Sequence, residues 1–316
     1  MNERLAVIVA SDVAQGPYAV GASQRLGELR ALASALCDEI QIVRPNEWRN
    51  APMKMDLAVG QSWSTLWALR QIAGRSRRVW FDACDSTIAL RLRTSHGAWL
   101  QSAAALLRDL SVSRRFRPDV VSYITARDAA QDACVWKEPP LTVPIHWKRF
   151  RPLPQLGQRR IVLVGDGNYL PNRRAAEWVL TQLVPKLRAL GATNPVWIYG
   201  PGYEKGQDRT VIFAGYEPDT NALYRCGDIH IAPVVSGAGM NSKVAVPLLA
   251  GLTVITTRLG IQGLKASERT VVCDLNDFAP EILRVLAREQ EPFLELTLSD
   301  LIEDDESEDL LARLDE

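Results

Sequence analysis

The segment Pro233–Thr257 constrains the fold more than any other part of the sequence. An apolar run, Ile229–Val235, stops at the small residues Ser236–Gly239, and an apolar pattern with helical spacing begins after Asn241–Ser242. A second apolar run follows at the end of the segment. This order predicts a strand, a glycine-rich turn, a helix and another strand.

The predicted turn has two interpretations. Gly237 and Gly239 would allow the backbone to approach a ligand closely, and the unpaired N–H groups of the following helix would favour a diphosphate. Lys243, in the first turn of that helix, would add a positive charge. The alternative is an ordinary strand-to-helix turn in which Ser242 caps the helix. This segment alone leaves both interpretations open.

The same alternation of apolar runs and helical patterns extends over the whole chain. We expect strands at 5–10, 40–43, 57–59, 79–81, 120–125, 160–165, 195–199, 211–213, 229–235 and 270–273. Helices are expected between them at 24–36, 64–73, 98–110, 126–133, 174–190, 222–226 and 278–288. This pattern predicts an α/β protein with two Rossmann-like, doubly wound parallel-sheet domains.

A proline-rich stretch separates the two halves. Five prolines lie between Pro139 and Pro154, and a length of 316 residues suits two domains. We therefore expect an amino-terminal domain over 1–152, a second domain over 153–290 and an acidic tail over 291–316. The tail is either solvated, which we favour, or a strap against the more basic first half.

Composition restricts the class of protein. The chain is 47% apolar, but no apolar run approaches the ~20 residues that span a bilayer, and the first residues lack a cleavable signal pattern. This indicates a soluble, cytoplasmic protein. The five cysteines form no C-x-x-C pair, which argues against a zinc site and a disulfide framework. No metal-binding residues are predicted.

Residues 160–288 resemble the nucleotide-binding domain of GT-B glycosyltransferases, and within them the large, mostly retaining group similar to glycosyltransferase family 4. Four motifs carry the resemblance in the family's order: Tyr169-x-Pro171-Asn172, IYGPG at 198–202, the stretch 211–233 and the stretch 236–257. The first half matches in layout only. The resemblance implies two domains that face a cleft, with the acceptor bound by the first half.

The resemblance also implies a nucleotide-diphosphate sugar donor, linked to UDP, GDP or dTDP. Its diphosphate would be stabilised by backbone N–H groups and by Lys243, with Arg173 a weaker candidate, so no metal would be required. The implied donor-binding residues are Gly167, Asn168, Gly200, Gly215, Tyr216, Ser236, Gly237, Gly239, Met240, Asn241, Ser242, Lys243 and Val244.

Two positions depart from the family pattern. The family places a glutamate three residues after the lysine, where it binds the ribose hydroxyls, and another five residues before the lysine; Val246 and Ala238 occupy these positions here. A valine side chain cannot accept a hydrogen bond. An unusual donor and a non-catalytic nucleotide-binding protein are both compatible with this loss.

Candidates for acid-base chemistry lie in the first half. Asp12 and Asp82 follow predicted strands, where ligands bind in parallel sheets, and Asp85 follows soon after. His96 is a further catalytic candidate, although a capping or surface role is its alternative. His230 alternates with isoleucines in a strand, which favours a structural role.

The acceptor is left open among several classes. Seven of the nine tryptophans lie in the first half, where indole rings could stack on sugars or bases. We favour a carbohydrate, a small molecule or a lipid-linked glycan reached by peripheral membrane contact. Residues 1–150 carry 20 Lys and Arg against 14 Asp and Glu, a modest excess for an enzyme that modifies bases in nucleic acid, which ranks second. Among functions, a sugar epimerase of the same fold ranks third, after the transferase and the non-catalytic nucleotide-binding or scaffold protein, because no cluster of acids and histidine supports it. The sequence does not determine the oligomeric state.

Overall fold

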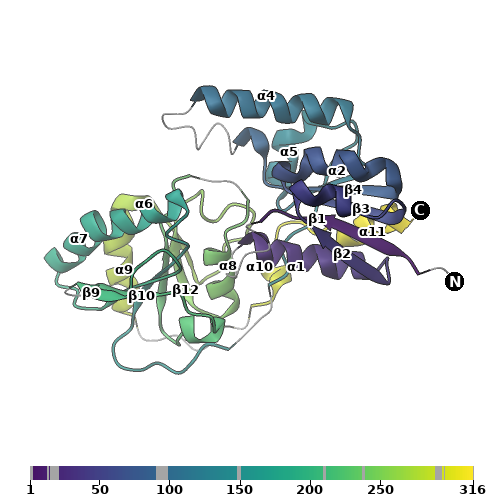
Figure 1. Cartoon of the computed structure of the whole chain (residues 1–316). Coiled ribbons are helices and arrows are strands. Elements are labelled where there is room, and N and C mark those ends of the chain that lie inside the picture. Colours follow the sequence, from purple (N-terminus) through teal and green to yellow (C-terminus); the bar gives the residue numbers. More distant parts are fainter. Residues whose placement is uncertain are drawn as a thin grey trace. The chain divides into compact units, whose positions relative to one another are not determined.

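The computed structural model describes residues 3–12, 14, 21–89, 99–147, 151–208, 211–236, 239–288, 294 and 296–315. The chain forms two compact units (Figure 1). The first comprises residues 1–146, 237–239 and 303–316, and the second comprises 147–236 and 240–302.

The first unit is built on a six-stranded parallel sheet in the order β2-β1-β3-β4-β5-β6. Its strands are β1 (Leu5–Val9), β2 (Glu39–Val43), β3 (Met55–Gln61), β4 (Ser76–Cys84), β5 (Val120–Tyr123) and β6 (Leu141–Thr142). The central strands are apolar along their length because helices cover both faces of the sheet.

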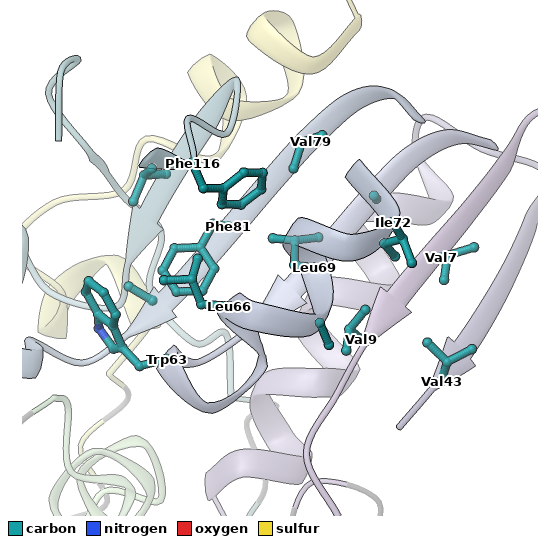
Figure 2. Packing of buried hydrophobic residues seen from close by; sticks show 14 of the residues in the cluster. Val7, Val9, Val43, Trp63, Leu66, Leu69, Ile72, Val79, Phe81 and Phe116 are labelled. Carbon is teal, nitrogen blue, oxygen red and sulfur yellow. The ribbon is translucent and has the colours of Figure 1, made fainter. Parts of the chain in front are cut away.

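Helices pack on both faces of this sheet. The helices of the first unit are α1 (Gly21–Ser34), α2 (Leu66–Ile72), α4 (Trp99–Arg115), α5 (Ala126–Asp132) and α11 (Ser307–Asp315), with short 3₁₀ turns η1 (Pro45–Asn50), η2 (Trp63–Thr65), η3 (Ala73–Arg75) and η4 (Ala133–Val135). On one face, Leu66, Leu69 and Ile72 of α2 pack against Val9 and Phe81 of the strands (Figure 2). On the other face, α1 and α11 form a second core with the sheet.

The acidic tail is part of the first unit. Leu310 and Leu314 of α11 are buried against Val120 and Leu141 in the same apolar cluster. The backbone of Glu306 donates to Thr142 O at 2.7 Å, and its carboxylate accepts from Thr142 N at 2.6 Å. The preference for a solvated tail is therefore wrong for residues 303–315, because two leucines with helical spacing give this acidic segment an apolar face.

The second unit contains a seven-stranded sheet in the order β13-β12-β11-β7-β8-β10-β9, in which only the β9–β10 pair is antiparallel. Its strands are β7 (Ile161–Val164), β8 (Val196–Tyr199), β9 (Gly206–Asp208), β10 (Val211–Gly215), β11 (Ile229–Ala232), β12 (Thr253–Thr256) and β13 (Thr270–Val272). Two parallel α/β sheets confirm the predicted fold class.

The helices of the second unit are α6 (Leu170–Trp178), the π-helical turn η5 (Val179–Leu183), α7 (Val184–Ala189), α8 (Ser242–Leu249), α9 (Phe278–Leu286) and α10 (Leu298–Leu301), with 3₁₀ turns η6 (Thr220–Leu223) and η7 (Leu275–Asp277). The single helix expected over 174–190 is interrupted by a π-helical turn. Pro185 follows that turn and has no N–H to donate to Thr181, which accounts for the break in the regular pattern. Within the described residues, no helix is long and apolar enough to cross a membrane.

Candidate functional site

The candidate donor site lies where three parallel strands of the second unit end. β7, β8 and β10 are neighbours in the sheet, so the loops that follow them meet at its carboxyl edge. Backbone hydrogen bonds join these loops: Gly165 N donates to Tyr199 O at 2.9 Å, Gly167 N to Pro201 O at 2.8 Å, and Gly200 N to Gly215 O at 2.9 Å.

Gly200 has no room for a side chain. Its φ of +144° lies in the region that favours glycine, and a Cβ atom there would lie 1.8 Å from Gly165 O. A Cβ atom on Gly167 would meet the Tyr203 ring at 2.9 Å. Glycine is therefore required at both predicted positions because the loops pack directly on each other.

Lys243 lies in the first turn of α8, and Asn172 in the first turn of α6. The Lys243 Nζ atom donates to Asn172 Oδ1 at 2.5 Å, and Asn172 Nδ2 in turn donates to Asp166 O at 3.1 Å. Burial lowers the pKa of Lys243 to about 8. Among the described residues, no carboxylate forms an ion pair with this ammonium group.

Asn172 is a residue of this site that the sequence-based list of binding residues omitted. Its side chain fixes Lys243 relative to the loop after β7, and a Cβ atom on Gly165 would clash with it at 2.9 Å. The motif Tyr169-x-Pro171-Asn172 contained this residue, but the motif alone gave no reason to separate its asparagine from its other members.

Some of the other predicted binding residues lie on loops of the second unit, and one is buried in its core. Asn168, on the loop after β7, is exposed and donates through its backbone to Asp166 Oδ1 at 2.9 Å. Asn241 precedes α8 and donates to Gly260 O at 3.2 Å. Val244 is fully buried in the core and packs away from solvent. The remaining members lie on these loops or at the start of α8, namely Gly215, Tyr216, Ser236, Met240 and Ser242.

In the glycine turn before α8, Gly239 lies within the described residues, whereas Gly237 and Ala238 lie outside them. Gly239 has a φ of +74°, and its N–H donates to Asp128 Oδ2 at 3.1 Å, in the first unit with which residues 237–239 group. A Cβ atom at Gly239 would lie 1.9 Å from Asp85 Oδ1. Glycine is therefore required here for both conformation and space.

Val246, at the position of the family's ribose-binding glutamate, belongs to the core. Its side chain is buried and packs in a cluster with Val162, Tyr224 and Leu252. An ionised glutamate in this cluster would lose its hydration without a partner. An apolar side chain such as valine therefore suits this position.

Asp82 is a fully engaged carboxylate in the first unit. It pairs with Arg25, whose Nε and Nη2 atoms donate at 3.0 and 2.5 Å, and both residues are almost completely buried. Ser122 Oγ donates at 2.7 Å and Cys84 Sγ at 3.0 Å. Because four donors already occupy its oxygens, this geometry favours a structural role over the predicted catalytic one.

The other predicted catalytic residues differ in their surroundings. Asp12 is exposed and forms a surface ion pair with Arg44 at 3.4 Å. His96 lies outside the described residues. His230 is buried against Tyr224, and burial lowers its pKa to about 3, consistent with a structural role.

Asp85 has the most unusual ionisation among the described carboxyls of the first unit. It follows β4 directly after Cys84, a non-glycine residue with a φ of +63°. Burial, then the charge of Asp128, raises the pKa of Asp85 to about 7, and burial also raises the pKa of Asp128. Among the described residues, no group of three or more His, Cys, Asp or Glu side chains could hold a metal ion.

The comparisons with known proteins agree with this arrangement. Residues 158–288 match the sequence profile of the family described as Glycosyl transferases group 1. No curated protein matches the chain in sequence. The matched segment, residues 158–288, is therefore a group 1 glycosyltransferase domain, and the chain as a whole has the GT-B fold.

Solved structures share the fold at low sequence identity. Anabaena HepE in complex with UDP and glucose has 10% identity and a TM-score of 0.62, over 90% of this chain and 89% of that one. The UDP-forming α,α-trehalose-phosphate synthase from Burkholderia xenovorans has 11% identity and a TM-score of 0.58, over 99% and 96%. TarM of S. aureus has 12% identity and a TM-score of 0.55 over 73% of this chain, which spans only 47% of TarM. The recognition of a GT-B glycosyltransferase is confirmed, and the closer likeness to family 4 stays a prediction.

Proposed function

We propose that this chain transfers a sugar from a nucleotide-diphosphate sugar to a hydroxyl of a glycan, a lipid-linked glycan or a small molecule. The observation that supports this proposal most strongly is Lys243: a partly buried ammonium group, held by Asn172 beside tightly packed glycine loops, with no ion-pair partner among the described carboxylates. An anionic ligand would supply the missing charge.

The diphosphate of the donor fits this position. In the transfer step, the bond between the anomeric carbon and the phosphate oxygen breaks, a bond to the acceptor oxygen forms, and the acceptor proton leaves to the departing diphosphate or to a nearby base. Lys243 and the N–H groups at the start of α8 would stabilise the charge that develops on the diphosphate. These groups would supply the stabilisation that other transferases obtain from a bound metal ion.

UDP is the first nucleotide to test, because HepE binds UDP and glucose in a related fold. We propose measuring thermal stability with UDP, GDP and dTDP and their sugars. Binding at a ligand concentration of about 100 Kd stabilises the folded state by about 2.7 kcal/mol, which produces a clear shift. We expect one nucleotide to give such a shift.

The matched variants are Lys243→Met and Lys186→Met. Lys186 lies on α7, is exposed, and donates to Asn276 O at 2.6 Å away from the loops. Lys243→Met should abolish the shift, whereas Lys186→Met should keep it. A shift that survives Lys243→Met would place the diphosphate elsewhere.

The buried Val246 supports a second candidate, a non-catalytic protein of the same fold. That candidate can bind a nucleotide and give a thermal shift, but it predicts no slow hydrolysis of the donor. Hydrolysis of the matching nucleotide sugar, measured without an acceptor, separates the two functions.

A further inference from the structure

A basic groove lies in the first unit, beside the beginning of β5. Its volume is about 510 Å³, and it is lined by the end of α4 with the following loop, by the residues after η4, and by α11. A volume of this size is typical of sites for discrete small molecules.

Positive charge dominates the groove. Arg114, Arg117, Lys137 and Arg313 line it, against two carboxylates, Asp119 and Glu138. Glu138 pairs with Lys137 at 4.0 Å. The lining therefore keeps an excess of two positive charges, carried by arginines from separate elements.

The groove's acidic residue Asp119 is already engaged elsewhere. Its Oδ2 atom accepts from Val79 N at 2.7 Å, and its Oδ1 atom lies 3.9 Å from Arg78 Nη1. Within the described part of the chain, Arg114, Arg117 and Arg313 form no ion pair or side-chain hydrogen bond. Three guanidinium groups thus surround one cavity without a protein acceptor.

The floor of the groove is rigid and apolar. Phe116, Val120 and Val121 are buried. Trp136 stacks on Trp63 with ring centroids 5.5 Å apart, and its indole N–H donates to the Tyr123 hydroxyl at 2.9 Å. The floor of the groove therefore belongs to the packed core of the unit, and the exposed arginines lie at its sides.

The groove is separate from the carboxylates of the first unit. β4 and β5 are parallel, and Asp82 and Asp85 lie at the end of β4, whereas the groove opens at the beginning of β5. The two places are therefore at opposite edges of the sheet. A ligand in the groove would not occupy the edge at which Rossmann-like sheets bind substrates.

We propose that this groove binds a phosphate-bearing ligand at a site distinct from the donor site. Planar guanidinium groups match phosphate oxygens in paired hydrogen bonds, and a ligand with at least two negative charges balances the excess charge of the lining. The phosphate belongs either to a soluble molecule or to a lipid headgroup, and the same arginines serve both.

The first experiment titrates inorganic pyrophosphate into the full chain by calorimetry. To remove the proposed donor site, each variant is also made with Lys243→Met. We expect the double variant Arg114→Gln/Arg117→Gln to bind pyrophosphate at least about tenfold more weakly in that background. Both side chains are exposed, so the fold is retained, which circular dichroism checks.

Arg115→Gln is the matched control. Arg115 is an exposed arginine beside Arg114 on α4, but it does not line the groove. The control should keep the affinity of the parent. Equal loss in the control and the double variant, or full binding by the double variant, would overturn the proposal. Because all variants are compared in the Lys243→Met background, this test does not depend on whether the second unit binds a nucleotide.

The second experiment identifies the source of the phosphate. The chain is sedimented with vesicles that contain cardiolipin, whose headgroup carries two phosphates, and with neutral phosphatidylcholine vesicles. Sedimentation with the anionic vesicles alone, lost in Arg114→Gln/Arg117→Gln, assigns the groove to a lipid headgroup; pyrophosphate binding without sedimentation assigns it to a soluble molecule. Binding of neither probe contradicts the site.

Discussion

At the scale of single residues, buried charges in the two units have opposite surroundings. Asp82 and Arg25 satisfy each other in the first unit, whereas Lys243 in the second donates to one amide oxygen, that of Asn172, and pairs with no carboxylate among the described residues. Burying an uncompensated charge is costly, so it persists where a ligand supplies the counter-charge. The Asp82–Arg25 pair therefore needs no ligand, whereas Lys243 is a candidate to bind an anionic one.

The lowered pKa of Lys243 predicts that donor binding depends on pH. With a pKa of about 8, the ammonium group loses its proton as pH rises from 7 to 9, while a nucleotide diphosphate stays ionised because its terminal phosphate titrates near pH 6. UDP affinity measured by calorimetry should therefore fall over this range. Lys243→Arg, which stays charged, should give a flat profile; equal slopes in both proteins would rule out Lys243 as the titrating group.

The Asp82–Arg25 pair predicts a large loss of stability when one partner is removed. Asp82→Asn leaves a buried guanidinium group without its counter-charge, which costs about 3–5 kcal/mol. Urea denaturation measures this loss. Asp12→Asn is the control, because the Asp12 side chain is 73% exposed and its surface pair with Arg44 contributes less than about 1 kcal/mol. Similar losses in both variants would contradict the structural role of Asp82.

At the scale of elements, the loops at the strand ends, where we propose that the donor binds, are short and packed on each other. The Gly200 turn after β8 accepts no side chain, and it is hydrogen bonded to the end of β10. The conformation of these loops at the carboxyl edge of the sheet is therefore fixed by backbone contacts between loops that follow different strands.

Gly200→Ala tests this packing. The added Cβ atom would overlap Gly165 O, so we expect a loss of at least about 2 kcal/mol in unfolding free energy, together with loss of nucleotide binding. Gly206→Ala, in β9, adds a Cβ atom that meets nothing within 4 Å and should keep both properties. Thermal denaturation with and without UDP compares the two variants, and an unaffected Gly200→Ala would show that the turn can move.

Much of this architecture was accessible from the sequence, because apolar runs that end in glycine identify buried parallel strands. The helix expected over 98–110 continues to Arg115, since Val112 adds another contact with the core. The two-residue strand β6 and the antiparallel β9 are too short for a periodic signal. The sequence predicts a catalytic role for Asp82 because this carboxylate follows an apolar run. The sequence does not show that Arg25, 57 residues away, pairs with it.

At the scale of the whole molecule, the first unit contains both ends of the chain. Apart from residues 237–239, the chain leaves this unit after His146 and returns at Glu303. The returning segment covers one face of the sheet with α11 and pairs with β6 through Glu306. The first unit is therefore incomplete without residues that follow the second unit in sequence.

The packing of α11 predicts a strong effect of one core substitution on stability. Leu310→Ala removes a fully buried side chain and should lower the unfolding free energy by about 2–5 kcal/mol. Leu311→Ala, on a partly exposed position of the same helix, should have a smaller effect. Denaturation followed by tryptophan fluorescence measures both; equal, small effects would show that α11 is dispensable.

His146, the last residue of the first unit before the chain enters the second, contacts the segment that returns to the first unit at Glu303. Its Nδ1 atom lies 2.7 Å from Glu28 Oε1, and its Nε2 atom lies 2.8 Å from Asp305 Oδ2, so the imidazolium ion binds α1 to the returning segment. The hydrogen bond to Glu28, followed by that to Asp305, raises the pKa of His146 to about 9, above its ordinary value of 6.5.

The folded state therefore binds more protons than the unfolded state between pH 6.5 and 9, and the stability from His146 is complete below this window and lost as pH rises through it. The side chain is 37% exposed, so solvent reduces the effect. We expect urea midpoints of the parent chain and of His146→Gln to differ at pH 6 and to converge near pH 9.5. Asp85 and Lys243 titrate in both proteins and cancel in this difference, so parallel curves would mean that folding does not raise the pKa of His146.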